Sequence, residues 1–318
     1  MDIMVSIICN TYNQESYIRL ALDSFLKQKT NFKYEVIVHD DASDDSTKDI
    51  IREYADNYPD IIKPIIEQEN QYSKNVNITL DIDLPKAKGK YFAFCEGDDY
   101  WIDENKLQKQ VDYMESHPNC TLCIHNAIKV NREGKVLGQY GNFKQDSIIT
   151  MDTVIKSGGE FCATNSIMAP TRLVQTVPNY LSNYCIDYFW QLYLAGEGYA
   201  YAFADDMSAY RINAVGSWTS VMRNNKNSFI KHLEAMYTNL IQYDLETKYA
   251  YHELIEQRIV GNRYSYYTVN RRFAELKKEP FKTYIKNLNR KEKLKLFLNK
   301  YTPHLFMIVS RVREIIFE

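Results

Sequence analysis

The sequence predicts an α/β fold, a mostly parallel sheet flanked by helices, with a helical C-terminal extension. Short apolar runs alternate with amphipathic, helix-like segments through the first half of the chain. Clusters of Asp and Asn follow three of these apolar runs. From residue 225 onward the pattern is almost entirely helical. We therefore expect a first domain over residues 1–220 and a helical region over 221–318.

The elements of the first domain can be assigned in chain order. Buried-strand patterns occur at 5–9, 35–39, 61–66, 91–95 and 121–125. Apolar residues at helical spacing predict helices over 18–25, 50–58 and 107–114, and the first of these is expected to open at Asn13 or Ser16. Because Pro64 has no N–H to donate, the third strand is expected at a sheet edge or a bulge. Repeated strand–helix–strand units imply parallel pairing with right-handed crossovers.

Beyond residue 151 the pattern loosens, although 187–195 predicts a helix and 199–203 a strand. The end of the chain is amphipathic, with an apolar series from Leu294 to Ile316 that is interrupted by Arg311 and Arg313. Two interpretations stay open for this tail. It packs on the domain or on a second copy of the chain, or it lies at a membrane surface as an interfacial helix.

Composition excludes several classes of protein. Lys plus Arg number 39 and Asp plus Glu number 41, a net charge of −2 that disfavours a nucleic-acid partner. Hydrophobic residues make up 45% of the chain, which excludes general disorder. Six cysteines without a metal-site spacing favour a reducing compartment. With no signal-peptide pattern and no long apolar run, a cytoplasmic location is expected, with peripheral contact at the inner face of the membrane left open.

Adjacent carboxylates follow the strand at 91–95. Asp98 and Asp99 would repel each other there unless a cation compensates them, and Mg²⁺ or Mn²⁺ held together with substrate phosphates would do so. Asp40 and Asp41 follow a second strand, and Asn10 to Asn13 follow a third. Ligands of such sheets bind beyond the carboxyl ends of the strands. A solvated helix N-cap is the alternative interpretation of the acidic pair.

Three segments together resemble family 2 inverting glycosyltransferases, which have the GT-A fold. These are 5–14, 36–47 and 89–99, and the resemblance extends loosely to about residue 215. It implies a metal-dependent enzyme, using Mn²⁺ or Mg²⁺, that transfers one sugar from a nucleotide-diphosphate donor, in the first instance a UDP-sugar. The implied acceptor is a lipid-linked saccharide in surface-polysaccharide synthesis. The absence of a Gln-x-x-Arg-Trp motif argues against a processive synthase.

The resemblance also assigns binding residues. It implies nucleotide contacts by Asn10, Thr11, Tyr12, Asp41, Asn75 and Asp98. Within this set, Tyr12 would stack on the base and Asp41 would accept a hydrogen bond from the base imide, whereas Asp40 would orient the loop. Asp99 is the expected metal ligand. Weaker matches suggest Glu160 and Asn165 as sugar contacts and Arg211 as a phosphate contact.

Inverting transfer requires a base. The acceptor hydroxyl must lose a proton as it attacks from the face opposite the leaving diphosphate, so a carboxylate is needed on that face. The resemblance places this base at the start of a helix before an aromatic stretch, where the chain has Asp187. An N-cap role for Asp187 is compatible with it. We expect Asp41, Asp99 and Asp187 to meet around one hollow.

Two alternative functions make different demands on the sequence. A sugar nucleotidyltransferase would carry a Gly-rich basic loop after the first strand, and residues 10–15 lack one. An inactive sugar- or nucleotide-binding scaffold subunit would not need the four carboxylates Asp41, Asp98, Asp99 and Asp187. The transferase is therefore the preferred hypothesis.

Overall fold

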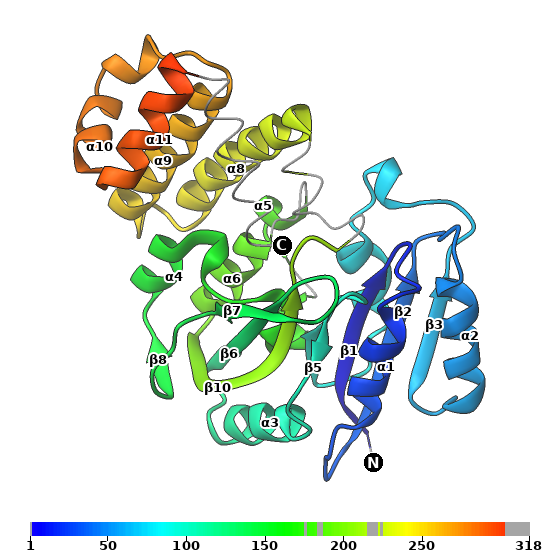
Figure 1. Cartoon of the computed structure of the whole chain (residues 1–318). Helices are drawn as coiled ribbons and strands as arrows, with labels where there is room; N and C mark the ends of the chain where they lie inside the picture. Colours follow the sequence, from blue (N-terminus) through cyan, green and yellow to red (C-terminus); the bar gives the residue numbers. More distant parts are fainter. Residues whose placement is uncertain (1, 175–176, 183–186, 215–221, 223–224, 303–318) are drawn as a thin grey trace. The chain divides into compact units, whose positions relative to one another are not determined.

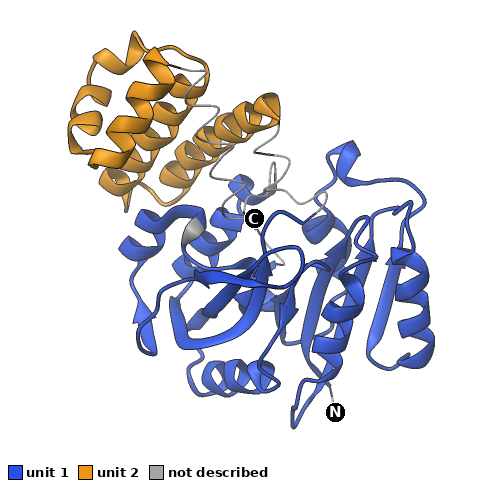
Figure 2. Cartoon of the chain, viewed as in Figure 1, with its two compact units in different colours: residues 1–220 blue, residues 221–318 orange. Residues whose placement is uncertain are grey.

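The structure is a computed structural model that describes residues 2–174, 177–182, 187–214, 222 and 225–302. The chain divides into two compact units, 1–220 and 221–318 (Figure 2). Unit 1 combines a sheet with helices and unit 2 is helical (Figure 1). The predicted α/β class with a helical C-terminal region is confirmed.

Within the described residues, unit 1 contains one sheet of ten strands. Its order is β3-β2-β1-β4-β9-β6-β10-β5, with β7 beside β6 and β8 beside β10. The strands are β1 (Ile3–Thr11), β2 (Lys33–Asp40), β3 (Ile62–Ile66), β4 (Tyr91–Phe94), β5 (Tyr100–Trp101), β6 (Cys120–Val130), β7 (Val136–Tyr140), β8 (Ser147–Ile149), β9 (Met168–Pro170) and β10 (Tyr199–Arg211). β1 pairs in parallel with β2 and β4, so their carboxyl ends share one edge.

Helices cover both faces of this sheet. They are α1 (Ile18–Leu26), α2 (Thr47–Asn57), α3 (Lys106–Ser116), α4 (Met151–Ser157), α5 (Asn179–Ser182) and α6 (Asp187–Gly196). Alternate residues of β1, such as Ile7, are fully buried in one core with Leu22 and Phe25 of α1. On the other face, the Phe92 and Phe94 rings lie 6.0 and 5.9 Å from the Trp190 ring of α6. The period-two alternation of strand side chains produces this division.

The predicted strands and helices of the first 130 residues are confirmed to within a few residues. β3, which contains Pro64, lies at the edge of the sheet, as expected. The predicted start of α1 is wrong, because Asn13 Oδ1 instead accepts a hydrogen bond from Asp44 N at 2.8 Å and Tyr17 precedes the helix without a side-chain cap. The strands β7, β8 and β9 were not predicted, and β10 is longer than predicted.

Buried cysteines and histidines pack in the interior of unit 1. The described cysteines are free and buried: Cys9, Cys95, Cys120, Cys123 and Cys162. Cys185 lies outside the described residues. His39 and His125 are also fully buried, and His39 Nδ1 is 2.9 Å from Asp83 Oδ1.

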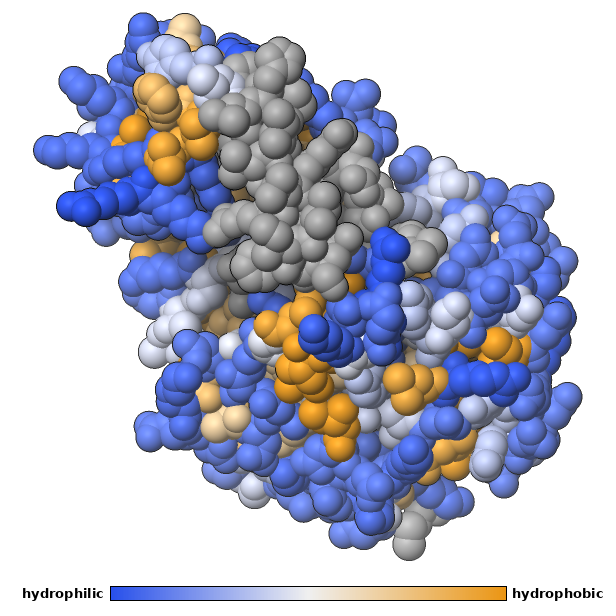
Figure 3. Space-filling model, in the orientation of Figure 1, coloured by the Kyte–Doolittle hydropathy of each residue, from blue (hydrophilic) through white to orange (hydrophobic). Residues whose placement is uncertain are grey.

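Unit 2 contains α8 (Lys226–Glu246), α9 (His252–Val269), α10 (Phe281–Asn287) and α11 (Arg290–Tyr301). The apolar side chains Leu294, Phe297 and Tyr301 of α11 are 57%, 55% and 60% exposed. Among the described helices, none has the length and apolar character that a membrane span requires. The face of the molecule in Figure 3 is mostly hydrophilic, with separate apolar groups. The predicted tail from residue 303 onward, with Arg311 and Arg313, lies outside the described residues.

Candidate active site

A pocket of about 380 Å³ lies beyond the carboxyl ends of β1 and β4. Its apolar wall includes Ile8, Phe94 and Trp190. Its polar side chains come from five separate segments of the chain: Asn10, Tyr72, Asn75, Asn77, Thr79, Glu96, Thr164 and Asp187. A mainly apolar cavity with a few convergent polar groups is the usual form of a small-molecule site.

The corner after β4 is built by close backbone packing. Gly97 N donates a hydrogen bond to Asn10 O at 3.0 Å, which continues the β1–β4 pairing. A Cβ atom at Gly97 would lie 2.5 Å from Thr11 Cγ2, so only glycine fits. The tight turn places Glu96 on the pocket wall, whereas Asp98 and Asp99, which follow it in the sequence, do not line the pocket.

Asp187 is the first residue of α6 and is exposed to the same pocket. Thr164 Oγ1 donates a hydrogen bond to its Oδ2 atom at 2.7 Å, which fixes the carboxylate, and no other side chain of the described residues bonds to it. Although the side chain faces the pocket, the surrounding protein limits its hydration and raises the pKa of Asp187. A raised pKa makes the ionised form a stronger base.

The acidic corner, formed by Glu96, Asp98 and Asp99, is poorly hydrated, so the charged forms of its carboxylates are disfavoured. Burial raises the pKa of Glu96 to about 8, and the charges of Asp187 and Asp98 add to this effect. Burial raises the pKa of Asp98 to about 6, against the opposing charge of Arg211. A divalent cation would relieve this repulsion, and hard cations prefer carboxylate oxygens together with substrate phosphates. The donor chemistry therefore fits Mn²⁺ or Mg²⁺, although the described residues contain no cage of three or more His, Cys, Asp or Glu ligands.

Asp99 ties the corner to β10. Its carboxylate is 2% exposed and accepts hydrogen bonds from Arg211 N at 2.7 Å and from Asn165 Nδ2 at 2.9 Å. Asn165 in turn accepts a hydrogen bond from Ser208 Oγ at 2.7 Å. Both Asp99 and Asn165 therefore lie behind the pocket wall, and their assignments as metal ligand and sugar contact stay predictions.

Arg211 holds the same corner from the other side. Its Nε donates to Asp98 O at 2.9 Å, and its Nη1 donates to Asn131 O and Arg132 O at 2.9 and 2.7 Å. The guanidinium also lies 4.5 Å from the centre of the Tyr17 ring. Most of its donors are thus committed to the backbone, and a phosphate contact by Arg211 stays a prediction.

The two other predicted corners follow β1 and β2 and support the pocket through hydrogen bonds. Asn10 Nδ2 donates to Thr79 Oγ1 at 3.1 Å, whereas Thr11 is buried and donates from its Oγ1 to His39 O. The carboxylate of Asp41 accepts hydrogen bonds from Gln71 N at 2.6 Å and Tyr72 N at 3.1 Å. Asp41 therefore fixes the backbone just before the residues that line the pocket.

Asp40 orients its loop, as expected, by accepting hydrogen bonds from Ser43 N and Oγ at 3.1 and 2.5 Å. Tyr12 is 43% exposed and does not line the pocket. The left-handed residue Asn75 does line it, with a φ of 62°. The side chain of Glu160 lies outside the described residues.

The structure brings together Asn10, Asn75 and Asp187 from the predicted set. Of the three carboxylates expected around one hollow, only Asp187 lines it, since Asp41 and Asp99 are turned into hydrogen bonds with the backbone behind it. Glu96 was missed, although it opens the acidic cluster in the sequence. Thr79 and Thr164 carry no signal that sequence reasoning could have used.

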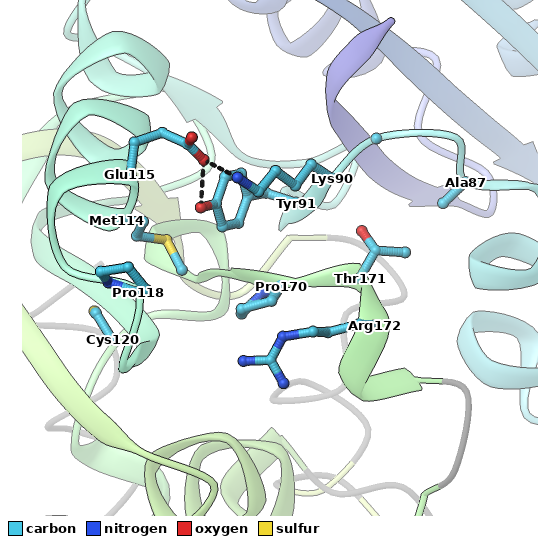
Figure 4. A pocket seen from close by; sticks show the side chains of 11 residues that line it. Ala87, Lys90, Tyr91, Met114, Glu115, Pro118, Cys120, Pro170, Thr171 and Arg172 are labelled. Carbon is cyan, nitrogen blue, oxygen red and sulfur yellow. Dashed lines mark hydrogen bonds and ion pairs between the residues drawn. The ribbon is translucent and has the colours of Figure 1, made fainter.

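A second hollow, of about 450 Å³, lies at the amino end of β4. Glu115 Oε1 there accepts from Tyr91 Oη and pairs with Lys90 Nζ, both at 2.6 Å, and Arg172 lies apart from this group (Figure 4). Because ligands of such sheets bind at the carboxyl ends of the strands, this hollow is not the candidate active site.

Solved structures with a similar fold include complexes with nucleotide sugars. The TarS 1–349 complex with UDP-GlcNAc from S. aureus has a TM-score of 0.59 and 16% identity, covering 94% of this chain and 79% of that one. The mannosyltransferase PcManGT of Pyrobaculum calidifontis, in complex with GDP-Man and Mn²⁺, has a TM-score of 0.57 and 17% identity, covering 99% and 88%. The fold is thus that of the GT-A glycosyltransferases.

Sequence similarity shows the family to which the chain belongs. The family described as Glycosyl transferase family 2 matches residues 6–168, and the chain belongs to it. An uncharacterized protein of Mycobacterium tuberculosis, Rv1520, is 37% identical over 217 residues, 68% of this chain and 61% of its own length. The Escherichia coli UDP-Glc:alpha-D-GlcNAc-diphosphoundecaprenol beta-1,3-glucosyltransferase WfgD is 32% identical over 163 residues, 51% of this chain and 59% of its own. The chain therefore spans about three fifths of the length of these relatives.

Proposed function

We propose that this chain transfers a single sugar, with inversion, from a UDP-sugar to a lipid-linked saccharide during surface-polysaccharide synthesis. The observation that carries the proposal is that Asp187, at the start of α6, and Glu96, beyond the end of β4, face one pocket. The similarity to WfgD, a UDP-Glc:alpha-D-GlcNAc-diphosphoundecaprenol beta-1,3-glucosyltransferase, supports a UDP-sugar donor and a lipid-linked acceptor. The polar residues Asn10 and Asn75 on the same pocket suit a nucleotide.

In this proposal Asp187 is the catalytic base. With Oδ2 held by Thr164, Oδ1 would accept the proton of the acceptor hydroxyl as that oxygen attacks the anomeric carbon. The bond between that carbon and the diphosphate breaks on the opposite face, so the configuration inverts. Asp98 and Glu96 would hold Mn²⁺ or Mg²⁺, which when bound supplies charge neutralisation for the departing diphosphate.

A donor panel tests the function. We expect one UDP-sugar, together with Mn²⁺, to raise the melting temperature of the full chain by about 4 °C or more, because a ligand at about 100 times its Kd adds about 2.7 kcal/mol of stability. Thermal shift with UDP-, GDP- and dTDP-sugars measures this, and donor hydrolysis identifies the sugar. No shift with any nucleotide would contradict the proposal, and a shift with GDP-sugars alone would exclude a UDP donor.

The same assay at two pH values is its internal control. Glu96 and Asp98, with pKa values raised to about 8 and about 6, must lose their protons before they bind a cation. The Mn²⁺-dependent part of the shift should thus be largest at pH 8 and decline as the pH falls toward 6. Without metal the stability trend runs the other way, since the folded state holds more protons than the unfolded state and loses stability as the pH rises.

We also infer a membrane contact by unit 2. Leu294, Phe297 and Tyr301 form an exposed apolar stripe at helical spacing on α11, which carries five Lys or Arg residues and one Glu. Such a helix suits the surface of an anionic bilayer, where each cation contributes about 1 kcal/mol. Its basic character favours lipid over a second copy of the chain, which would bring like charges together.

Vesicle flotation tests this contact. The full chain should float with vesicles that contain phosphatidylglycerol and not with pure phosphatidylcholine, and the double variant Leu294→Ser, Phe297→Ser should lose most of this binding. Tyr58→Ser, which changes an exposed tyrosine of unit 1, is the control and should float as the unchanged chain does. A stripe that instead mediates dimers, seen by sedimentation with no flotation, would contradict the inference.

A further inference from the structure

A third pocket, of about 410 Å³, lies between the end of β7 and α4, and we call it the β7–α4 pocket. Three aromatic rings line it, those of Tyr140, Phe143 and Phe161. Its other lining side chains are mostly polar: Lys129, Gln139, Asn142, Ile149, Thr153 and Ser157. Its volume falls within the range of small-ligand sites, about 300–1,000 Å³.

The pocket is constructed around a buried amide. Asn126, which is 1% exposed, accepts a hydrogen bond from Phe143 N at 3.0 Å and donates to Phe143 O at 2.9 Å. Gly141 has a φ of 81°, and a Cβ there would lie 2.7 Å from Asn126 Oδ1. These contacts hold the backbone that carries Asn142 and Phe143 in one conformation. The amide of Asn142 and the ring of Phe143 therefore start from a fixed backbone before any ligand binds.

The pocket adjoins the candidate active site. Phe161 lines it, and Thr164, three residues later, bonds to Asp187 in the active-site pocket, so the chain between them spans at most about 11 Å. Tyr140 Oη donates to Gly159 O at 2.9 Å, which ties β7 to the same connecting segment. The Tyr140 ring also lies 5.2 Å from the ring of Tyr210.

Electrostatics agree with this placement. Burial raises the pKa of Tyr210, and the charges of Asp99, Asp187 and Glu96 raise it further. Tyr210 therefore lies within electrostatic reach of the acidic corner while it packs on a wall of the β7–α4 pocket. The β7–α4 pocket and Asp187 are thus linked both by Tyr210 and by the short segment from Phe161 to Thr164.

We propose that the β7–α4 pocket binds a pyranose residue of the acceptor saccharide. A pyranose has apolar C–H faces that pack on aromatic rings and a rim of hydroxyls that needs donors and acceptors. Phe143 and Phe161, whose ring centres are 5.9 Å apart, supply the apolar surface. The exposed groups of Asn142 and Ser157, with Lys129, supply the polar rim. The assignment rests on the proposed function and adds to it the site that orients the acceptor.

Saturation-transfer NMR on the full chain tests the proposal, with methyl β-glucoside, methyl N-acetyl-β-glucosaminide and methyl β-glucuronide as probes. At least one should bind in the presence of saturating UDP, which blocks the donor site. Phe143→Leu, which keeps an apolar side chain but removes the ring, and Asn142→Ala should each weaken binding about 3- to 10-fold. Both should keep the nucleotide-induced thermal shift.

The control is Ile148→Ala, which changes an exposed residue of β8 outside the pocket and should bind as the unchanged chain does. The proposal is overturned if no glycoside binds, or if Phe143→Leu and Asn142→Ala bind as tightly as the unchanged chain. Glycoside binding that depends on these residues in a chain without any nucleotide shift would support a saccharide site while refuting the proposed transferase function.

Discussion

Replacing Asp187 with Asn is expected to lower the turnover number by about 10²- to 10⁴-fold, the usual contribution of a general base. The amide keeps the size of the side chain and can still accept the hydrogen bond from Thr164, but it cannot take a proton from the acceptor. Nucleotide affinity should be unchanged or slightly higher, because a negative charge near the diphosphate is removed. Turnover with the donor found in the panel and calorimetry with UDP measure the two quantities.

Two further variants make this result specific. Asp49→Asn changes an exposed acid in the first turn of α2, so it reproduces the loss of a helix-start carboxylate away from the pocket and should keep full activity. Thr164→Val removes only the hydrogen bond to Asp187 and should have an intermediate effect. Normal turnover of the Asp187→Asn enzyme would remove Asp187 from the mechanism.

The parallel core could be predicted because its pattern is local. The strands at 5–9, 35–39 and 91–95 are rich in buried apolar residues, because both faces of a parallel sheet are covered, and polar residues such as Ser6 and Glu35 interrupt them only singly. Edge placement of β3 followed from the missing N–H of Pro64 alone. By contrast, the residues of β7 are exposed or half-buried, so they carry no apolar pattern, and β9 has only three residues.

The sequence predicts which loops form the site, namely those that follow β1, β2 and β4, but not which side chains of those loops face the pocket. Asp99 is held by Arg211 N, 112 residues away in sequence, and by Asn165, 66 residues away. No local pattern encodes partners at such separations, so the sequence could not distinguish the buried carboxylate of the pair from the one nearer the pocket. Asp41 illustrates the same limit, because its backbone partners, Gln71 N and Tyr72 N, lie beyond α2 and β3, 30 and 31 residues later in the sequence.

The variants Asp98→Ala and Asp99→Ala should therefore have opposite effects on stability. In Asp99→Ala, Arg211 N and Asn165 Nδ2 lose an acceptor in a buried place, which should lower the free energy of unfolding by about 2–4 kcal/mol. In Asp98→Ala, no side chain of the described residues loses a hydrogen bond, and repulsion with Glu96 is relieved. Its metal-free melting temperature should be unchanged or higher.

Metal-dependent nucleotide binding should show the reverse order. Mutation of a residue that only supports a metal ligand typically lowers metal affinity by roughly 10- to 100-fold. Removal of a direct ligand should cost at least as much. Asp98→Ala should accordingly lose about 10-fold or more of the Mn²⁺-dependent affinity for UDP, measured by calorimetry with and without Mn²⁺. Asp99→Ala, measured below its melting temperature, should keep most of it. If Asp99→Ala instead folds with unchanged stability and loses the Mn²⁺ dependence, the cation belongs to Asp99, and the hydrogen bonds from Arg211 and Asn165 must give way when it binds.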